Sequence, residues 1–164
     1  MKSSKEKEIV IMGMMTAASF AGQIAMSFLP NIEIVTFLFI LYTLLLGKNV
    51  CLVIYAFVLL EGIFYGFGLW WLNYLYIWTI LAIVVLIFRN QQSVWFWSIV
   101  SGFYGLSYGA LCSIIYLFIG GINTAFAYWV SGLGFDVIHC IGNVVVCLIL
   151  YKPLRYVLEK SYNS

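Results

Sequence analysis

Six apolar runs occupy most of this chain, and they constrain its fold more than any other feature. They cover residues 9–29, 34–47, 50–65, 69–88, 94–119 and 125–151. Short clusters of glycine, proline, asparagine or arginine separate the runs, as expected for turns. Because a helix needs about 20 apolar residues to cross the hydrocarbon core, the runs predict an all-α integral membrane protein. We expect six transmembrane helices in a single membrane domain, residues 1–164.

The composition excludes several classes of soluble protein. The chain is 65% hydrophobic and only 9% charged, whereas soluble domains have about 25% charged residues. Six spans of about 20 residues leave no room for a second, aqueous domain. We therefore expect no fused ATPase, kinase or DNA-binding module and no nucleic-acid partner. The sequence also lacks a phosphate loop of the form G-x-x-x-x-G-K-[ST].

The basic residues predict the orientation in the membrane. With six spans, all of them fall on one side: Lys2, Lys5, Lys7, Lys48, Arg89, Lys152, Arg155 and Lys160. Since lysine and arginine are retained on the cytoplasmic side, both termini are predicted to be cytoplasmic. The second run would rise only about 20 Å as a helix, so a re-entrant segment is the alternative there. That alternative would move Arg89 to the face opposite the amino-terminal lysines.

The sequence also predicts how the first and the last apolar runs behave. The first run is longer than the apolar region of a typical cleaved signal peptide, so it is expected to remain as a helix. At the other end, Pro153 is expected to close the sixth span because proline interrupts helical hydrogen bonding. A short interfacial helix is expected to follow it.

Small residues recur at a spacing of four along the first run, at Gly13, Ala17, Ala21 and Ala25. They therefore share one helix face. In a membrane such a face lets another backbone approach closely, because association there relies on packing. The face either packs against another helix of this chain or docks a partner membrane protein.

Three ionisable residues lie inside the predicted spans: Glu61, Asp136 and His139. Each costs on the order of 3 kcal/mol near the bilayer centre, so each needs a partner or a function. Glu61 has no basic residue at comparable depth, which favours a functional role over a protonated carboxyl bonded to a helix carbonyl. Asp136 and His139 are three residues apart, so they form either a structural hydrogen-bonded pair or part of a ligand site.

Aromatic residues flank these groups on the predicted outer side, among them Trp70 and Tyr128. They could form the walls of a small-molecule pocket, although tryptophan and tyrosine also anchor helices at both membrane interfaces. The four cysteines show no C-x-x-C pairing, so we expect no metal site. Because the H-E-x-x-H motif is absent, no catalytic residues are assigned.

Two stretches resemble a known family. Residues 29–38, LPNIEIVTFL, continue to Gly47, and residues 127–143, AYWVSGLGFDVIHCIGN, are followed by Lys152-Pro153-Leu154. Together they resemble the substrate-binding S-component of energy-coupling factor (ECF) transporters. The resemblance extends over essentially the whole chain in length, number of spans and orientation.

The resemblance implies a multi-pass protein of the bacterial plasma membrane that binds a vitamin or related micronutrient near the outer face. Its partners would be a transmembrane coupling subunit and two cytosolic ATPases. ATP is used by those partners, and this chain would carry no cofactor. The family's A-x-x-x-A docking motif matches Ala17 and Ala21, extended by Ala25, and its lid loop matches residues 30–33. The implied candidates for ligand contact are Asn31, Glu61, Trp70, Asn73, Tyr128, Asp136 and His139.

The charge distribution limits the chemical classes of ligand that we expect. No lysine or arginine is predicted in the outer half of the membrane, so no fixed cation is available for a carboxylate or phosphate. We therefore expect a neutral or cationic ligand that contains a ring. One alternative function is a small membrane enzyme acting on lipid or cell-wall intermediates, with Asp136 and His139 as acid and base. Another is a purely structural assembly partner.

Overall fold

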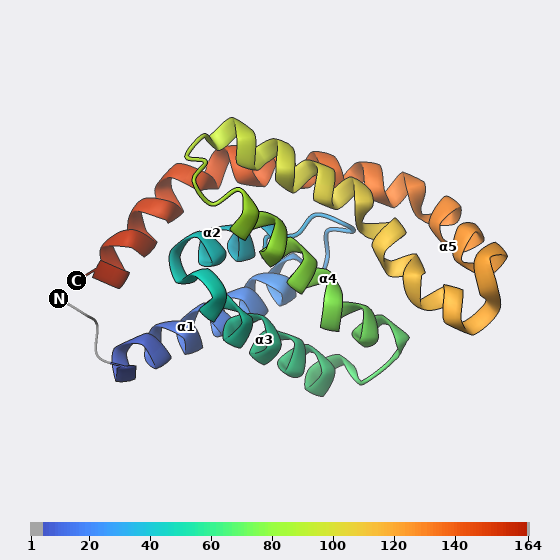
Figure 1. Cartoon of the computed structure of the whole chain (residues 1–164), viewed down its shortest axis with the longest axis horizontal. Coiled ribbons are helices and arrows are strands. Elements are labelled where there is room, and N and C mark those ends of the chain that lie inside the picture. Colours follow the sequence, from blue (N-terminus) through green and yellow to red (C-terminus); the bar gives the residue numbers. More distant parts are fainter. Residues whose placement is uncertain (1–4, 164) are drawn as a thin grey trace.

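The computed structural model describes residues 5–163, which are helical apart from short connections (Figure 1). The elements are α1 (Lys5–Met26), α2 (Val35–Leu46), the 3-10 turn η1 (Gly47–Asn49), α3 (Val50–Tyr65), α4 (Leu69–Ile87) and α5 (Val94–Asn163). No strand occurs in this part of the chain. Apolar helices satisfy their own backbone hydrogen bonds, as a lipid environment requires. The all-α prediction is confirmed.

Four stretches are long and apolar enough to cross a membrane: Lys5–Met26, Val35–Tyr65, Leu69–Ile87 and Val94–Tyr162. Two of these stretches contain a glycine with positive φ. Gly47, at φ +58°, separates α2 from α3, and Gly121, at φ +74°, divides α5 into two arms. Figure 1 shows these arms running side by side as a long hairpin. The helices identify a membrane protein.

Helix α2 lies at the centre of the bundle. It contacts α1, α3, α4 and α5, and every residue from Val35 to Thr43 is buried. The ring of Phe39 is surrounded by aromatic side chains, with Phe57 at 5.4 Å and Trp78 at 5.2 Å between ring centroids. With 12 residues, α2 is about 18 Å long. It is therefore a buried core helix and is shorter than each α-helix that it contacts.

The two arms of α5 pack closely through glycines of the first arm. A Cβ atom at Gly105 would lie 2.9 Å from the backbone carbonyl carbon of His139, and one at Gly102 would lie 2.5 Å from Val144. At Gly109 a Cβ atom would overlap the carboxylate of Asp136. The absence of side chains at these positions lets the second arm approach the first, as at other close helix contacts in membranes.

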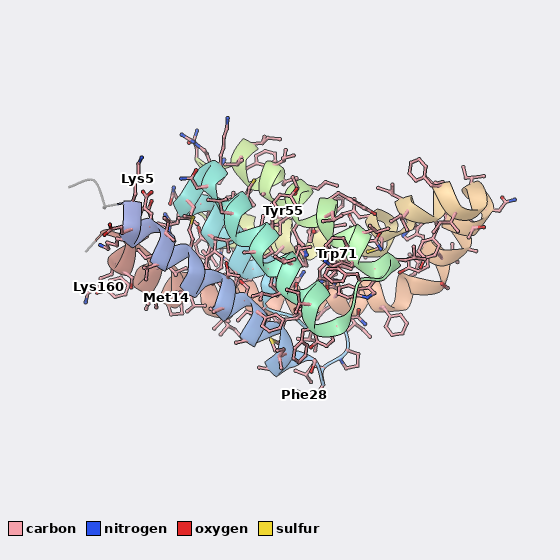
Figure 2. All side chains as sticks on the ribbon, turned by 90° about the horizontal axis from the view of Figure 1, so that it is seen from below. Lys5, Met14, Phe28, Tyr55, Trp71 and Lys160 are labelled. Carbon is pink, nitrogen blue, oxygen red and sulfur yellow. The ribbon has the colours of Figure 1, made fainter. Side chains whose placement is uncertain are left out.

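The start of α1 and the end of α5 meet at one end of the molecule. Tyr162 donates a hydrogen bond from its hydroxyl to Glu8, at 3.3 Å. Figure 2 shows Lys5 and Lys160 at this end, whereas Phe28 lies at the far end of α1. Basic residues from the start of α1 and the end of α5 therefore lie together at one end of the molecule.

The expected break of the helix at Pro153 is wrong. The second arm of α5 continues through Pro153 to Asn163 without a break. Buried Tyr151 precedes the proline, and the partly buried side chains of Leu154 and Leu158 pack against the core beyond it. Proline removes one backbone donor, and we attribute the continuity of the helix to this side-chain packing on both sides.

The arm-to-arm contact makes a stability prediction. The variant Gly105→Leu should lower the free energy of unfolding by about 1–3 kcal/mol, because the added side chain overpacks the interface with His139. Thermal unfolding in detergent measures the effect. Gly132→Leu is the matched control on the same helix, since a Cβ atom there meets nothing within 4 Å. Equal melting temperatures of the two variants would contradict the close packing of the arms.

Candidate functional site

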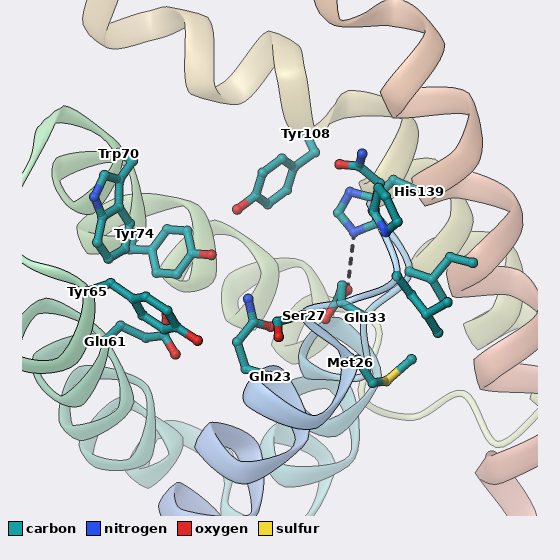
Figure 3. A pocket seen from close by; sticks show the side chains of 14 residues that line it. Gln23, Met26, Ser27, Glu33, Glu61, Tyr65, Trp70, Tyr74, Tyr108 and His139 are labelled. Carbon is teal, nitrogen blue, oxygen red and sulfur yellow. Dashed lines mark hydrogen bonds and ion pairs between the residues drawn. The ribbon is translucent and has the colours of Figure 1, made fainter.

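A cavity of about 510 Å³ opens at the end of the bundle away from Lys5 and Lys160. Its walls come from the end of α1, the α1–α2 connection, the end of α3, the start of α4 and both arms of α5. Figure 3 shows the side chains that face this space. The volume falls within the range of about 300–1,000 Å³ that is typical of small-molecule sites.

The connection between α1 and α2 covers one side of the cavity. Residues 29–33 all contribute to its lining. Asn31 has a φ of +58°, a conformation that residues other than glycine rarely adopt, asparagine being one of the more tolerant. One short hydrogen bond in the connection joins the Leu29 amide to the Met26 carbonyl, at 2.9 Å. The connection therefore forms one wall of the cavity.

Glu33 links this connection to the hairpin arm that lies 106 residues later. Its Oε1 atom is 3.2 Å from the Nε2 atom of His139, and this contact is drawn as a dashed line in Figure 3. Its Oε2 atom accepts a hydrogen bond from the Thr36 amide at 2.9 Å, which satisfies one free donor at the start of α2. Both carboxylate oxygens are therefore occupied.

The surroundings of Glu33 favour its charged form. Burial by itself raises the pKa of this carboxyl, but the hydrogen bond and the charge interaction with His139, together with the bonds from Thr36, outweigh burial. The net result is a pKa below the ordinary value of 4.5. Glu33 is thus a carboxylate held in place by His139 and the start of α2.

Glu61 faces the cavity from the last turns of α3. Its side chain is only 2% exposed, and its Oε1 atom is buried without a hydrogen-bond partner. In Figure 3 it lies beside Tyr65 and points toward the space that Gln23 approaches from α1. Glu61 therefore differs from Glu33, which already has two partners.

Aromatic rings form the remaining wall of the cavity. Trp70 and Tyr74, near the start of α4, meet edge to face with 5.3 Å between their centroids. Tyr108 comes from the first arm of α5 and lies 4.9 Å from the ring of His139. These rings surround the space from the α4 side to the α5 side (Figure 3). The site therefore combines aromatic surfaces with two carboxylates.

Four of the seven ligand-contact candidates line the cavity: Asn31, Glu61, Trp70 and His139. The other three do not belong to its lining. Asn73 accepts a hydrogen bond from the Tyr76 hydroxyl at 2.8 Å. The ring of Tyr128 stacks on Tyr116 near the tip of the hairpin, 4.2 Å between centroids.

Asp136 is the third candidate outside the lining. Its Oδ1 atom accepts a hydrogen bond from the Gly109 amide at 2.9 Å, across the two arms of α5. It therefore belongs to the contact between the arms, whereas His139 faces the cavity and bonds to Glu33. The two residues do not bond to each other in the described structure, although they are one helical turn apart.

Several residues of the cavity were not among the seven ligand-contact candidates: Gln23, Tyr65, Tyr74 and Tyr108. They lie within long apolar runs or at their ends, where tyrosine also serves as an interface anchor. Glu33 entered the sequence prediction only as the last residue of the loop 30–33, without an assigned contact. The sequence signal that could have identified these residues was the clustering of polar and aromatic residues at the predicted outer ends of the helices.

No group of three histidine, cysteine or acidic residues comes together as a metal site within residues 5–163. The cysteines are separate, with Cys112 and Cys147 buried among apolar side chains. In comparisons with known proteins, no protein-family model, no curated protein and no solved structure matches this chain. The interpretation of the cavity therefore depends on its own chemistry.

The contacts of Glu33 make a pH-dependent prediction. Because the pKa of Glu33 is lowered on folding, its contribution to stability is fully present above pH 4.5 and is lost as the pH falls below that value. The melting temperature of the wild type should therefore exceed that of Glu33→Gln at neutral pH. The difference should shrink at acidic pH in thermal unfolding experiments. If the difference in melting temperature stays constant from neutral to acidic pH, the charge of Glu33 does not stabilise the fold.

Proposed function

We propose that this chain is the substrate-binding S-component of an ECF-type importer. In this proposal it captures a vitamin or related micronutrient, neutral or cationic and containing a ring, at the outer face of the cell membrane. A transmembrane coupling subunit and two cytosolic ATPases then drive delivery inward. The cavity beneath the α1–α2 connection is the observation that carries the proposal, because it offers a small-molecule site with a covering segment.

The exposed face of α1 supports the proposed docking of a coupling subunit. Gly13, Ala17, Ala21 and Ala25 are all exposed, whereas Met15 and Ser19 face inward and are buried. Within residues 5–163, therefore, no other helix occupies the small-residue face, which was the alternative interpretation of the sequence. An exposed face of small residues is suited to close packing against another membrane helix.

The proposed topology has six crossings, namely α1, α2, α3, α4 and the two arms of α5, with both termini cytoplasmic. The positions of the basic residues support it. Arg89 and Arg155 line one small pocket at the end opposite the large cavity, and Lys5 and Lys160 lie at the same end as each other (Figure 2). Lys2 lies outside the described residues. Under the positive-inside rule this end is cytoplasmic, so the large cavity faces outward.

The membrane-enzyme alternative has less support. It relies on Asp136 and His139 acting together as acid and base, which requires both to face one reacting group. Asp136 instead bonds to the Gly109 amide between the arms, outside the cavity lining. No observation in the described structure favours this alternative over binding and transport.

The docking proposal is tested by replacing Ala17 and Ala21 with leucine. The double variant should lose co-purification with a co-expressed ECF coupling subunit, because the larger side chains prevent close approach. Co-purification is measured by affinity capture of the tagged chain and identification of the coupling subunit. Ala56→Leu on the exposed side of α3 is the matched control and should retain the complex. Retained binding by the double variant would contradict the proposed docking face.

Occupancy of the cavity is tested by native mass spectrometry of the purified chain. We expect a co-purified small molecule in the wild type and its loss in Ser27→Trp, because the added ring fills part of the cavity. Ser131→Trp is the matched control, since both serines are exposed and bond to the carbonyl three residues earlier. The Ser131→Trp variant should keep the bound molecule. If the molecule is retained by Ser27→Trp and lost from Ser131→Trp, the ligand binds elsewhere.

A further inference from the structure

The cavity is lined by acidic groups without a matching lysine or arginine among the described residues. Its described lining contains two carboxyl groups, Glu33 and Glu61, and no lysine or arginine. The basic side chain in this lining is that of His139, and it is already bonded to Glu33. An anionic ligand would therefore face two acidic groups without an available fixed cation. A ligand carboxylate or phosphate is normally bound by arginine or lysine.

Glu61 is the buried carboxyl in this lining that has an oxygen without a partner. Glu33 bonds to His139 and to the Thr36 amide, but the buried Oε1 atom of Glu61 has no hydrogen-bond partner. An unpaired buried carboxyl is unfavourable by several kcal/mol when charged, and it is stabilised by an opposite charge with good hydrogen-bond geometry. The position of Glu61 at the cavity wall lets a bound molecule supply that charge (Figure 3).

The aromatic walls favour the same kind of ligand. Trp70 and Tyr74 lie on the side of the cavity where Glu61 and Tyr65 approach it (Figure 3). The faces of tryptophan and tyrosine rings attract cations, and they also stack on planar rings. Aromatic faces beside an unpaired carboxyl thus complement a flat molecule that carries a positive charge.

We propose that the cavity binds a planar aromatic ligand with a cationic nitrogen group, for which Glu61 is the counter-ion. The proposal depends on the proposed function for the identity of the cavity as the substrate site, and it narrows the substrate from neutral or cationic to cationic. Trp70, Tyr74 and Tyr65 enclose the ring of the ligand. Glu33 remains bonded to His139 and keeps the covering connection in place.

The test uses three probes that share one ring and differ in charge: benzamidinium, benzamide and benzoate. Their dissociation constants are measured by calorimetry on the purified full chain in detergent. Benzamidinium should bind at least about tenfold more tightly than benzamide, as a charge-assisted contact is roughly twice as strong as a neutral one. Benzoate should bind more weakly than benzamide.

The variant Glu61→Gln separates charge from shape, because glutamine keeps the size and hydrogen-bonding capacity of the side chain. It should weaken benzamidinium binding by about tenfold and leave benzamide affinity nearly unchanged. Glu6→Gln is the matched control, since Glu6 is exposed at the other end of α1. It should leave all three affinities unchanged.

Three results would overturn the cation proposal: binding of benzoate or benzamide as tight as that of benzamidinium, benzamidinium binding that persists in Glu61→Gln, or no binding of any probe. The ranking of the probes on the wild type decides the matter if the variant does not fold. These outcomes are independent of the docking test with Ala17 and Ala21. A cation-selective cavity without coupling-subunit binding would retain this inference and reject the transporter assignment.

Discussion

The burial of α2 on all sides is the packing constraint on which the rest of the structure depends. Residues Val35 to Thr43 have almost no exposed surface, and four other helices contact this short segment. Because α2 is only about 18 Å long, it leaves space beyond its first turn that longer neighbours continue to enclose. The cavity lies next to that first turn, where Glu33 bonds to the Thr36 amide. The short central helix and the cavity are thus parts of one arrangement.

A second consequence concerns the covering connection between α1 and α2. Glu33 joins the first turn of α2 to His139 on the second arm of α5, so three distant parts of the chain meet at one carboxylate. The arm reaches this position because Gly105 permits close contact with the backbone at His139. Packing of the hairpin therefore determines where the histidine lies. The hydrogen bond then determines where the connection lies over the cavity.

The structure also separates residues that look alike in the sequence. Asp136 and His139 lie one helical turn apart, and sequence reasoning treated them as one polar pair that was either structural or functional. In the structure Asp136 bonds to the Gly109 amide and contributes to the contact between the arms. His139 faces the cavity and bonds to Glu33. A rotation of about 300° over three helical positions is enough to send the two side chains to different neighbours.

The sequence by itself determined the apolar helices, the turns at its glycine and proline clusters and the gathering of small residues on one face of α1. These properties depend on local composition and on the 3.6-residue helical period. Glu61 and His139 were conspicuous as ionisable groups in apolar runs, whereas Asn31 and Trp70 were candidates that the family resemblance implied. Only the tertiary structure decided that these residues share a cavity, that tyrosines from three helices complete it, and that Glu61 alone of its two carboxyls lacks a partner. Such relations depend on which helices pack together and how closely, and local sequence patterns do not encode that information.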